Sequence, residues 1–412
     1  MSTMERTRST SRRDYDPCDD AVVEDPFPTF HDLQQNDPVH WSRHLNGWVL
    51  TRHDDVRNAL LLSVNRITPF LTHQSERARA GFHDLELIAL WSSFNDAPAH
   101  THLRGLMNRA INPRYIAAAE PTIRDVVERL LDRVCAQGGM DVIAEFAGRL
   151  PISVMARLLG LPSEDVDQLH DWSEEVNLFV GAAKGLADKY QRAARGVADM
   201  SAYFREVLGQ RKSAPAEDLV SRLIAADVDG DRMSDDEIVA TCVMLTYAGH
   251  VTTAHLIGNG VLALLRNPSQ LALLRQDPSL IRAAVEEMFR YDGPIQAMVR
   301  VADRDMELHG TAIRHGDRLF PMLNAANRDP ERFDDPDAFN IVRGDTRHIV
   351  FGYGPHTCIG MPLARLEIPI AFARLLERID AIELAGPVRW INSVAFRGPA
   401  TLPVTFGAAG HA

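Results

Sequence analysis

Cysteine is scarce in this 412-residue sequence, which has four, at Cys18, Cys135, Cys242 and Cys358, and no C-x-x-C pair. Such wide spacing argues against a disulfide framework and against a zinc site built from thiolates. The sequence also lacks an apolar run long enough to cross a bilayer, and its charged, Ser- and Thr-rich N-terminus has no apolar signal segment. We therefore expect free thiols, no membrane anchor and a cytoplasmic location.

An excess of positive charge is also absent. The chain has 44 Lys and Arg residues against 56 Asp and Glu residues, a net charge of −12. An acidic protein repels phosphate backbones, so binding to nucleic acid is disfavoured. Hydrophobic residues make up 45% of the chain and charged residues 24%, which is an ordinary balance for a globular protein.

The chain divides into an expected tail and one large domain. Residues 1–24 are predicted to be a disordered tail, and residues 25–412 a single domain without an internal linker. Helical periods of Leu, Val, Ala and Arg dominate residues 100–290, whereas short β-prone pieces precede and follow them. Asn46-Gly47 between two apolar runs predicts a hairpin. The sequence thus predicts a mainly α fold with a small β region.

One helix is expected to be unusually long. Ser234 and Glu237 have the spacing of a capping box, and they open an apolar stretch that continues to about Arg266. At about 1.5 Å per residue, such a helix would cross the whole molecule. Residues 242–248 are apolar on every side, which predicts that the middle of the helix is buried.

The segment from Phe351 to Gly360 is the most informative in the chain. Its glycines and a proline form a tight loop that presents Cys358 just before a predicted helix. Unpaired N–H groups at a helix N-terminus stabilise negative charge and lower the pKa of a thiol. A thiolate there can be a nucleophile or a metal ligand, and a buried structural thiol is the alternative.

The order Phe-Gly-x-Gly-x-His-x-Cys-x-Gly resembles the haem-binding loop of the cytochrome P450 superfamily of haem-thiolate monooxygenases. This resemblance implies that Cys358 is the proximal ligand of the iron of haem b, with Phe351, Gly352 and His356 in the surrounding loop. It also implies the cytochrome P450 fold, in which the long central helix lies over the haem.

Other segments extend the resemblance in the same chain order. Glu287 and Arg290 match the E-x-x-R helix of the family, and Arg343 matches a third member of that cluster, for which we predict a role in folding. On its own, an i, i+3 pair is usually a solvated contact of small energy. His100 and Arg104 match the helix that binds a haem propionate, and Arg300 and His356 stand where the family has further propionate partners. An exposed basic helix is the alternative for the first pair.

The middle of the long helix resembles the oxygen-binding segment of the family. Ala248 and Gly249 are the small residues expected beside the haem, with Gly249 leaving room for dioxygen, and Thr252 is the hydroxyl expected to assist proton delivery. Alternatively, the Thr252 hydroxyl bonds to a carbonyl one turn earlier. The sequence departs from the family at Val251, where an acid is expected. Proton delivery must then use water, a substrate group or, as the weakest candidate, His250, or the chemistry differs from plain hydroxylation.

The substrate pocket is expected to be apolar, as small-molecule sites generally are. By position in the family, its candidates are Trp91, Phe94, Phe179, Leu245, Ile295 and Phe396. Ordinary core packing is the alternative for each of them. A small lipophilic natural product of secondary metabolism fits such a lining.

The resemblance implies a monooxygenase that uses O₂ and NAD(P)H, most simply for hydroxylation. Because the chain has no flavin or iron–sulfur motif, electrons are expected from an external ferredoxin and its reductase. The candidates for a basic docking face are five arginines, namely Arg104, Arg109, Arg343, Arg347 and Arg365. A peroxide-driven peroxygenase and a non-catalytic haem-binding protein that recruits a partner are the alternatives.

Overall fold

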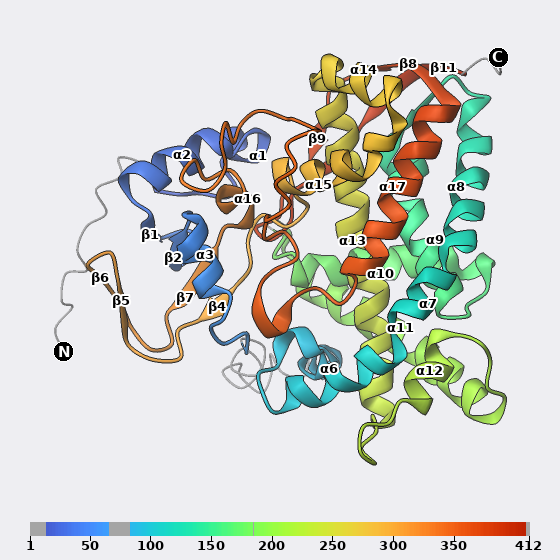
Figure 1. The fold of residues 1–412 in the computed structure, drawn as a ribbon. Helices are drawn as coiled ribbons and strands as arrows, with labels where there is room; N and C mark the ends of the chain where they lie inside the picture. The colour runs from blue at the N-terminus through green and yellow to red at the C-terminus, as the bar shows by residue number, and fades with distance from the viewer. Residues whose placement is uncertain (1–13, 66–82, 184, 409–412) are drawn as a thin grey trace.

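A computed structural model describes residues 14–65, 83–183 and 185–408 (Figure 1). The N-terminal residues 1–13 of the expected tail lie outside the described residues. The prediction of disorder is wrong for residues 14–24. They include the short helix α1, Asp20–Glu24, and the buried side chain of Tyr15. The Tyr15 N–H donates to His40 Nε2 at 3.1 Å, and the Tyr15 carbonyl accepts from Ser42 Oγ at 2.7 Å.

The centre of the molecule is helix α13, Asp235–Arg266. It begins with the predicted capping box, in which the Ser234 side chain and the Glu237 side chain each accept a backbone N–H of the other. Helices α9, Arg149–Leu158, α10, Val166–Val180, and α11, Lys189–Ser213, pack against it. Most of its side chains are buried, as the apolar pattern predicts.

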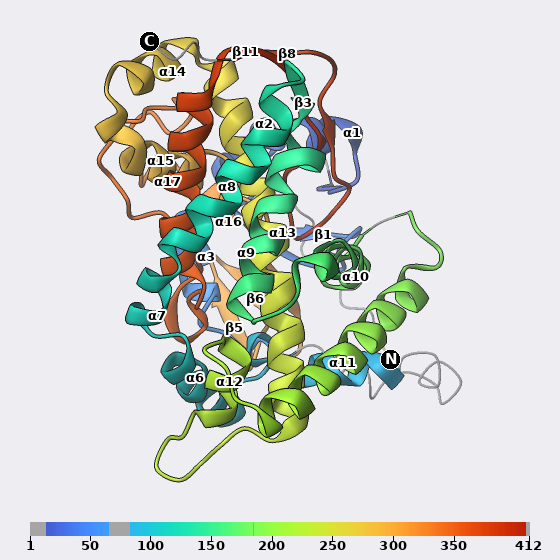
Figure 2. The ribbon, with the colours of Figure 1, turned by 90° about the vertical axis from the view of Figure 1, so that its right-hand side faces the viewer.

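Helix α17, Met361–Arg378, lies on another side of α13 and packs also against α8, Glu120–Cys135. Helices α13 and α17 run in the same direction (Figure 1). They touch where Gly260 faces Phe372, because a Cβ at Gly260 would lie 2.7 Å from the Phe372 ring. From this contact they separate towards their N-termini (Figure 2).

Shorter helices complete the helical part. They are α2 (Phe27–Asn36), α3 (His53–Ala59), η1 (His83–Leu90), η2 (Ser92–Phe94), α6 (Ala99–Ala110), α7 (Pro113–Ala118), η3 (Val142–Ala147), η4 (Ser163–Asp165), α12 (Leu219–Ala225), α14 (Pro268–Gln276), η5 (Pro278–Leu280), α15 (Ile281–Tyr291), α16 (Leu323–Ala326) and η6 (Gly354–His356).

The β structure of the described residues is small and divided among four sheets. The largest has the order β1 (Val39–Ser42), β2 (Gly47–Leu50), β7 (Arg318–Pro321) and β4 (Arg300–Val301), with β2 and β7 parallel. Strands β3 (Gly139–Asp141), β11 (Pro403–Ala408) and β8 (Ile379–Leu384) form the second sheet. Two-stranded sheets pair β5 (Met306–Leu308) with β6 (Thr311–Ile313) and β9 (Arg389–Trp390) with β10 (Pro399–Thr401).

The predicted hairpin is confirmed as β1 and β2. Asn46 has a φ of 47°, which suits the turn between them. A side chain at Gly47 would clash, since its Cβ would lie 2.7 Å from the Arg318 carbonyl oxygen of β7. The mainly α fold with a small β region is confirmed. None of the helices in the described part of the chain combines the length and apolarity that crossing a membrane requires.

Candidate active site

Cys358 lies in a tight loop that leads into α17. Gly352 and Gly354 have φ values of 76° and 79°, which favour glycine, so the chain can turn just before η6 and again at its first residue. The Cys358 N–H donates to the Phe351 carbonyl at 2.9 Å and closes the loop. The Phe351 ring packs on Phe289 of α15 with centroids 4.7 Å apart, which fixes the loop on the helix behind it.

The sulfur of Cys358 lies inside the protein, but no other described part of the chain covers it. Burial raises its pKa, although backbone hydrogen bonds from Gly360 and Met361 and the charge of Arg104 lower it. The expectation of a low thiol pKa is therefore wrong for the chain alone, because desolvation exceeds the effect of the helix N-terminus. The residue is nevertheless exposed, so its sulfur is available as a ligand.

Four predicted propionate partners gather beside this loop. The rings of His100, on α6, and His356 have centroids 4.0 Å apart, and Arg104 Nη2 donates to the Thr357 carbonyl at 2.7 Å. Burial lowers the pKa of His100, and the charge of Arg104 lowers it further. Burial, then His100 and Arg300, lower the pKa of His356 to about 4. The positive charges of Arg104 and Arg300, which contribute to these shifts, favour an anionic group beside the two histidines.

Helix α13 is uncovered at its predicted oxygen-binding segment. Ala248 is exposed, and Gly249 and Thr252 are half-buried, although their neighbours along the helix are buried. The Thr252 hydroxyl donates to the Ala248 carbonyl at 3.1 Å, which is the alternative that the sequence left open. Its oxygen keeps a lone pair that can accept from water or from another donor.

Gly249 has a packing reason that its predicted role did not include. A Cβ at this position would lie 2.8 Å from Met155 Cγ on α9. The space that the missing side chain leaves is therefore on the side of α9, and the glycine permits the two helices to approach closely.

The residues that flank this segment offer no acid. Val251 is 1% exposed, so an aliphatic side chain stands at the position of the expected acid. His250 is also buried and points to α10, where its Nδ1 lies 3.2 Å from Ser173 Oγ. Water and a substrate group are thus the proton sources that this geometry favours.

The structure brings the three predicted folding residues together behind the cysteine loop. Arg290, on α15, binds both oxygens of Glu287 at 2.8 Å, and Arg343 Nε lies 3.2 Å from each of them. Glu287 and Arg290 are buried, and Arg343 is half-buried. The charge of Arg343 is compensated by Glu287, which makes it a weak candidate for the predicted docking face.

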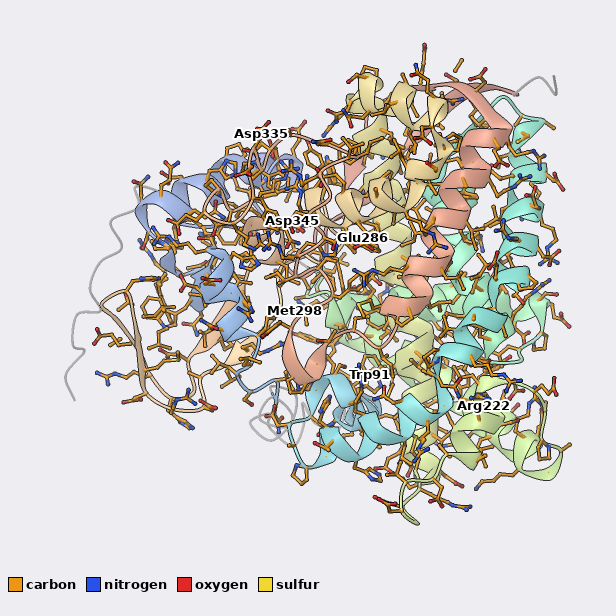
Figure 3. The ribbon with its side chains drawn as sticks, viewed as in Figure 1. Trp91, Arg222, Glu286, Met298, Asp335 and Asp345 are labelled. Atoms are coloured by element: carbon orange, nitrogen blue, oxygen red, sulfur yellow. The ribbon has the colours of Figure 1, made fainter. Side chains whose placement is uncertain are left out.

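Another ion pair joins α15 to α17. Arg365 binds Glu286 through two hydrogen bonds of 2.7 and 2.8 Å, and His348 Nε2 lies 3.1 Å from the same carboxylate (Figure 3). Arg365 is thus partly neutralised, and among the predicted docking residues Arg109 and Arg347 remain exposed. Arg347 pairs with Asp345 at the surface, where such a pair is weak.

Part of the predicted substrate pocket forms one aromatic group. Trp91 stacks on Phe94 and on Tyr247, with centroids 5.8 Å apart in both pairs, and Tyr247 meets Phe396 at 6.5 Å. Phe396 also forms a β-bridge with Ile295. The remaining candidates lie on helices: Phe179 contacts Tyr190 of α11 at 6.0 Å, and Leu245 is buried in α13.

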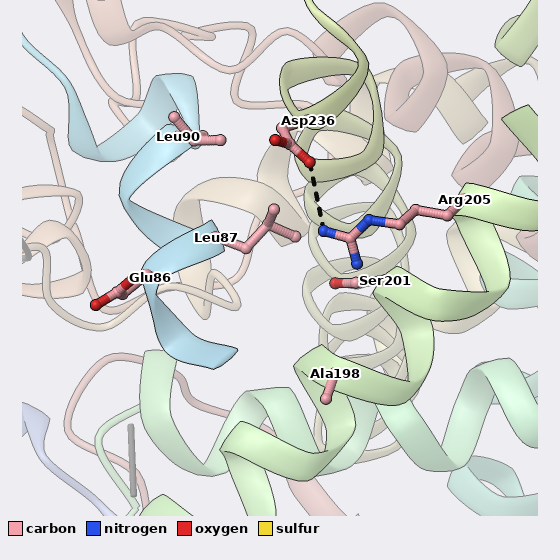
Figure 4. Close-up of a pocket in the computed structure, with 7 residues that line it drawn as sticks. All are labelled: Glu86, Leu87, Leu90, Ala198, Ser201, Arg205 and Asp236. Atoms are coloured by element: carbon pink, nitrogen blue, oxygen red, sulfur yellow. Dashed lines mark hydrogen bonds and ion pairs between the residues drawn. The ribbon is translucent and has the colours of Figure 1, made fainter. Parts of the chain in front are cut away.

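A separate surface pocket of about 440 Å³ lies between η1, α11 and the first turn of α13 (Figure 4). It is lined by Glu86, Leu87, Leu90, Ala198, Ser201, Arg205 and Asp236. Arg205 pairs with Asp236 at 3.3 Å across it. None of the predicted site residues belongs to this lining, so the pocket is distinct from the cysteine loop.

Sequence reasoning missed three residues around the site. Tyr247 completes the aromatic group and directly precedes Ala248, so its position on the helix next to the predicted oxygen-binding segment could have identified it. Glu286 precedes the predicted Glu287 but carried no signal of its own. Glu367, six residues into α17, is buried with its Oε1 unpaired, and burial raises its pKa to about 8.

Comparisons with known proteins agree with this arrangement. The family model described as cytochrome P450 matches residues 83–384. The chain is 38% identical to cytochrome P450 107B1 of Saccharopolyspora erythraea, over 95% of this chain and 97% of that protein. It is 36% identical to the vitamin D(3) 25-hydroxylase of Pseudonocardia autotrophica, over 97% and 98%. The crystal structure of CalO2 is similar with a TM-score of 0.88 and 35% identity, over 96% of this chain and 100% of that one.

Proposed function

The chain belongs to the cytochrome P450 family and is an oxidoreductase that incorporates oxygen, and we propose that it hydroxylates a small lipophilic substrate with haem b bound through Cys358. The observation that carries this proposal is the sulfur of Cys358, held by N–H groups of Gly360 and Met361 and yet left uncovered inside the protein.

The side chains present fit haem b. Cys358 offers a sulfur to the iron, while His100, Arg104, Arg300 and His356 offer donors and positive charge to two propionates. The helices α13 and α17 separate towards their N-termini, and Ala248 and Cys358 both lie on that side of their contact. When bound, haem supplies the iron at which dioxygen is reduced, with one oxygen atom passing to the substrate.

The chain contributes charge control and proton supply. Two N–H groups and Arg104 stabilise the thiolate form of Cys358 against its burial. Thr252 holds its hydroxyl at the uncovered face of α13, where the oxygen can accept from a water that carries protons. The aliphatic side chain of Val251 cannot relay protons, so the protons must reach Thr252 through water that comes from another part of the site. If this limits turnover, Val251→Glu raises the product formed per NADPH consumed, and an unchanged ratio excludes the explanation.

The substrate class is inferred from the aromatic group of Trp91, Phe94, Tyr247 and Phe396. These four rings are buried, and a substrate that reaches them meets large apolar contacts and few polar ones, which suits a lipophilic molecule. A relative in Bacillus subtilis named for polyketide biosynthesis is 34% identical, which supports a substrate of secondary metabolism. Four free cysteines are consistent with a cytoplasmic enzyme.

We propose that the electrons come from NAD(P)H through a reductase and an acidic ferredoxin. Arg109 and Arg347 are the exposed cations on the predicted docking face. Arg109→Glu with Arg347→Glu should slow reduction by ferredoxin at low salt, whereas Arg314→Glu, directly after the distant strand β6, should not. Equal rates for both variants would contradict this docking face.

The deciding experiment compares two oxidant supplies with one screened substrate. The proposal expects product with ferredoxin, reductase, NADPH and O₂, and little product with hydrogen peroxide alone. Product with peroxide alone would instead identify a peroxygenase. A substrate that shifts the haem spectrum and is converted under neither condition would favour a haem-binding protein that recruits a partner.

A further inference from the structure

Three side chains with metal-ligating atoms meet between α10 and α13, away from the uncovered face of α13. They are His170 and Glu174 of α10 and His250 of α13. Their ligand atoms all lie within 4.8 Å of one another. His170 and Glu174 are four residues apart and therefore share one face of their helix. No step of the proposed oxidation uses any of the three.

The two imidazoles lie close enough to share one metal ion. Their ring centroids are 4.9 Å apart, with an angle of 54° between the rings. Two imidazoles on one tetrahedral zinc ion, with Zn–N bonds of about 2.0 Å, have centroids about 5 Å apart. The ligand atom of Glu174 lies within 4.8 Å of those of the two histidines, so a movement of its side chain and of the rings towards one ion completes a set of two histidines and one carboxylate.

The side chain of His250 is buried and held in place by its neighbours. A hydrogen bond to the backbone of Gly148 orients the ring, in the manner of the outer partners of metal-binding histidines. Its Nδ1 faces Ser173 Oγ at 3.2 Å, on the side of α10.

Glu174 balances part of the charge that a metal ion would bring. Its side chain is exposed at the edge of the helix pair. Asn177 donates a hydrogen bond to it. The exposure also provides an entry path from solvent.

We propose that His170, Glu174 and His250 bind one divalent transition-metal ion of the zinc type, which ties α10 to α13. Two nitrogens and one carboxylate oxygen are a zinc donor set, with a fourth position left for water. His250 directly follows the segment Ala248-Gly249, and α10 carries Phe179 of the expected substrate pocket. The ion thus links the helix at the active site to a helix beside the substrate. This inference is independent of the proposed substrate and electron donor.

The test uses haem-loaded protein from which a chelator has removed metal ions other than the haem iron. This protein is then titrated with zinc chloride. Calorimetry and elemental analysis after desalting should find one saturable zinc ion per chain. Glu174→Gln and His170→Asn should weaken binding at least about tenfold, as loss of one ligand implies. Glu175→Gln is the matched control, because it makes the same chemical change one residue further along α10 and should leave zinc binding unchanged.

Hydrogen exchange measured in the same samples tests the link between the helices. Zinc should slow exchange in α10 in the native protein and in Glu175→Gln, but not in Glu174→Gln. Absence of saturable binding, or equal affinity in all variants, would overturn the site. Saturable binding that requires Glu174 but leaves exchange in α10 unchanged would overturn the link. The haem absorption spectrum of each variant shows that its fold is intact.

Discussion

Replacing Glu287 by Gln should cost far more stability than the same change at the surface. Glu287 is 2% exposed and Arg290 is not exposed at all. The carboxylate accepts from Arg290 at 2.8 Å, from Arg343 at 3.2 Å and from the Asn340 N–H at 2.9 Å. Glutamine keeps the shape but loses the charge, so two guanidinium groups remain without their shared counter-ion.

The magnitude follows from that burial. Removing one partner of a buried ion pair costs about 3–5 kcal/mol, because the other charge stays desolvated. Arg290 cannot escape to solvent, since it also donates to the carbonyls of Asn327, Pro336 and Ala338. We therefore expect Glu287→Gln to lower the free energy of unfolding by about 4 kcal/mol.

Urea unfolding of the haem-loaded protein measures this loss, with Glu120→Gln as the control. Glu120 pairs with Arg124 on the surface of α8, where the two side chains are 44% and 53% exposed. Such a pair contributes at most about 1 kcal/mol. Equal losses in the two variants would refute the reasoning, because they would mean that Glu287 acts as an ordinary surface charge.

Two further predictions concern Glu286 and Gly249. Burial raises the pKa of Glu286, but hydrogen bonds and charges from His348 and Arg365 outweigh burial and lower this pKa to about 2. The ionised carboxylate therefore stabilises the fold by up to about 3 kcal/mol. This stabilisation is complete above about pH 5 and is lost as the pH falls towards 2. Urea titrations should show a weaker dependence over that range in Glu286→Gln, and an unchanged dependence would contradict the shift. Gly249→Ala should lower the free energy of unfolding by about 1–3 kcal/mol through its clash with Met155. The loss should shrink when Met155→Ala is combined with it, and strictly additive losses in a double-mutant cycle would show that the two positions do not meet.

Local patterns predicted the parts of the fold that local interactions determine. The long helix was predictable because Ser234 and Glu237 form a capping box and the apolar run after them has no break. The β1–β2 hairpin was predictable because Asn46-Gly47 suits a tight turn. The order of residues in the cysteine loop likewise pointed to the family that the comparisons support.

Long-range packing accounts for what the sequence did not reveal. Nothing local distinguishes Tyr15 from a residue of a disordered tail, and its burial depends on His40 and Ser42 of β1. The reason for Gly249 lies in Met155, more than ninety residues earlier in the chain. Arg343 could be assigned to the buried cluster only through the family resemblance, because no spacing along the chain links it to Glu287.

The absorption spectrum of the dithionite-reduced protein with carbon monoxide tests the central claim most directly. Native protein should bind haem and show the strongly red-shifted Soret band of a thiolate-ligated ferrous–CO complex. Cys358→Ser should lose this band, and Cys135→Ser, a change at a half-buried thiol elsewhere, should keep it. Folded native protein without haem, or with haem but without the red shift, would contradict the assignment of Cys358 as the ligand of the iron.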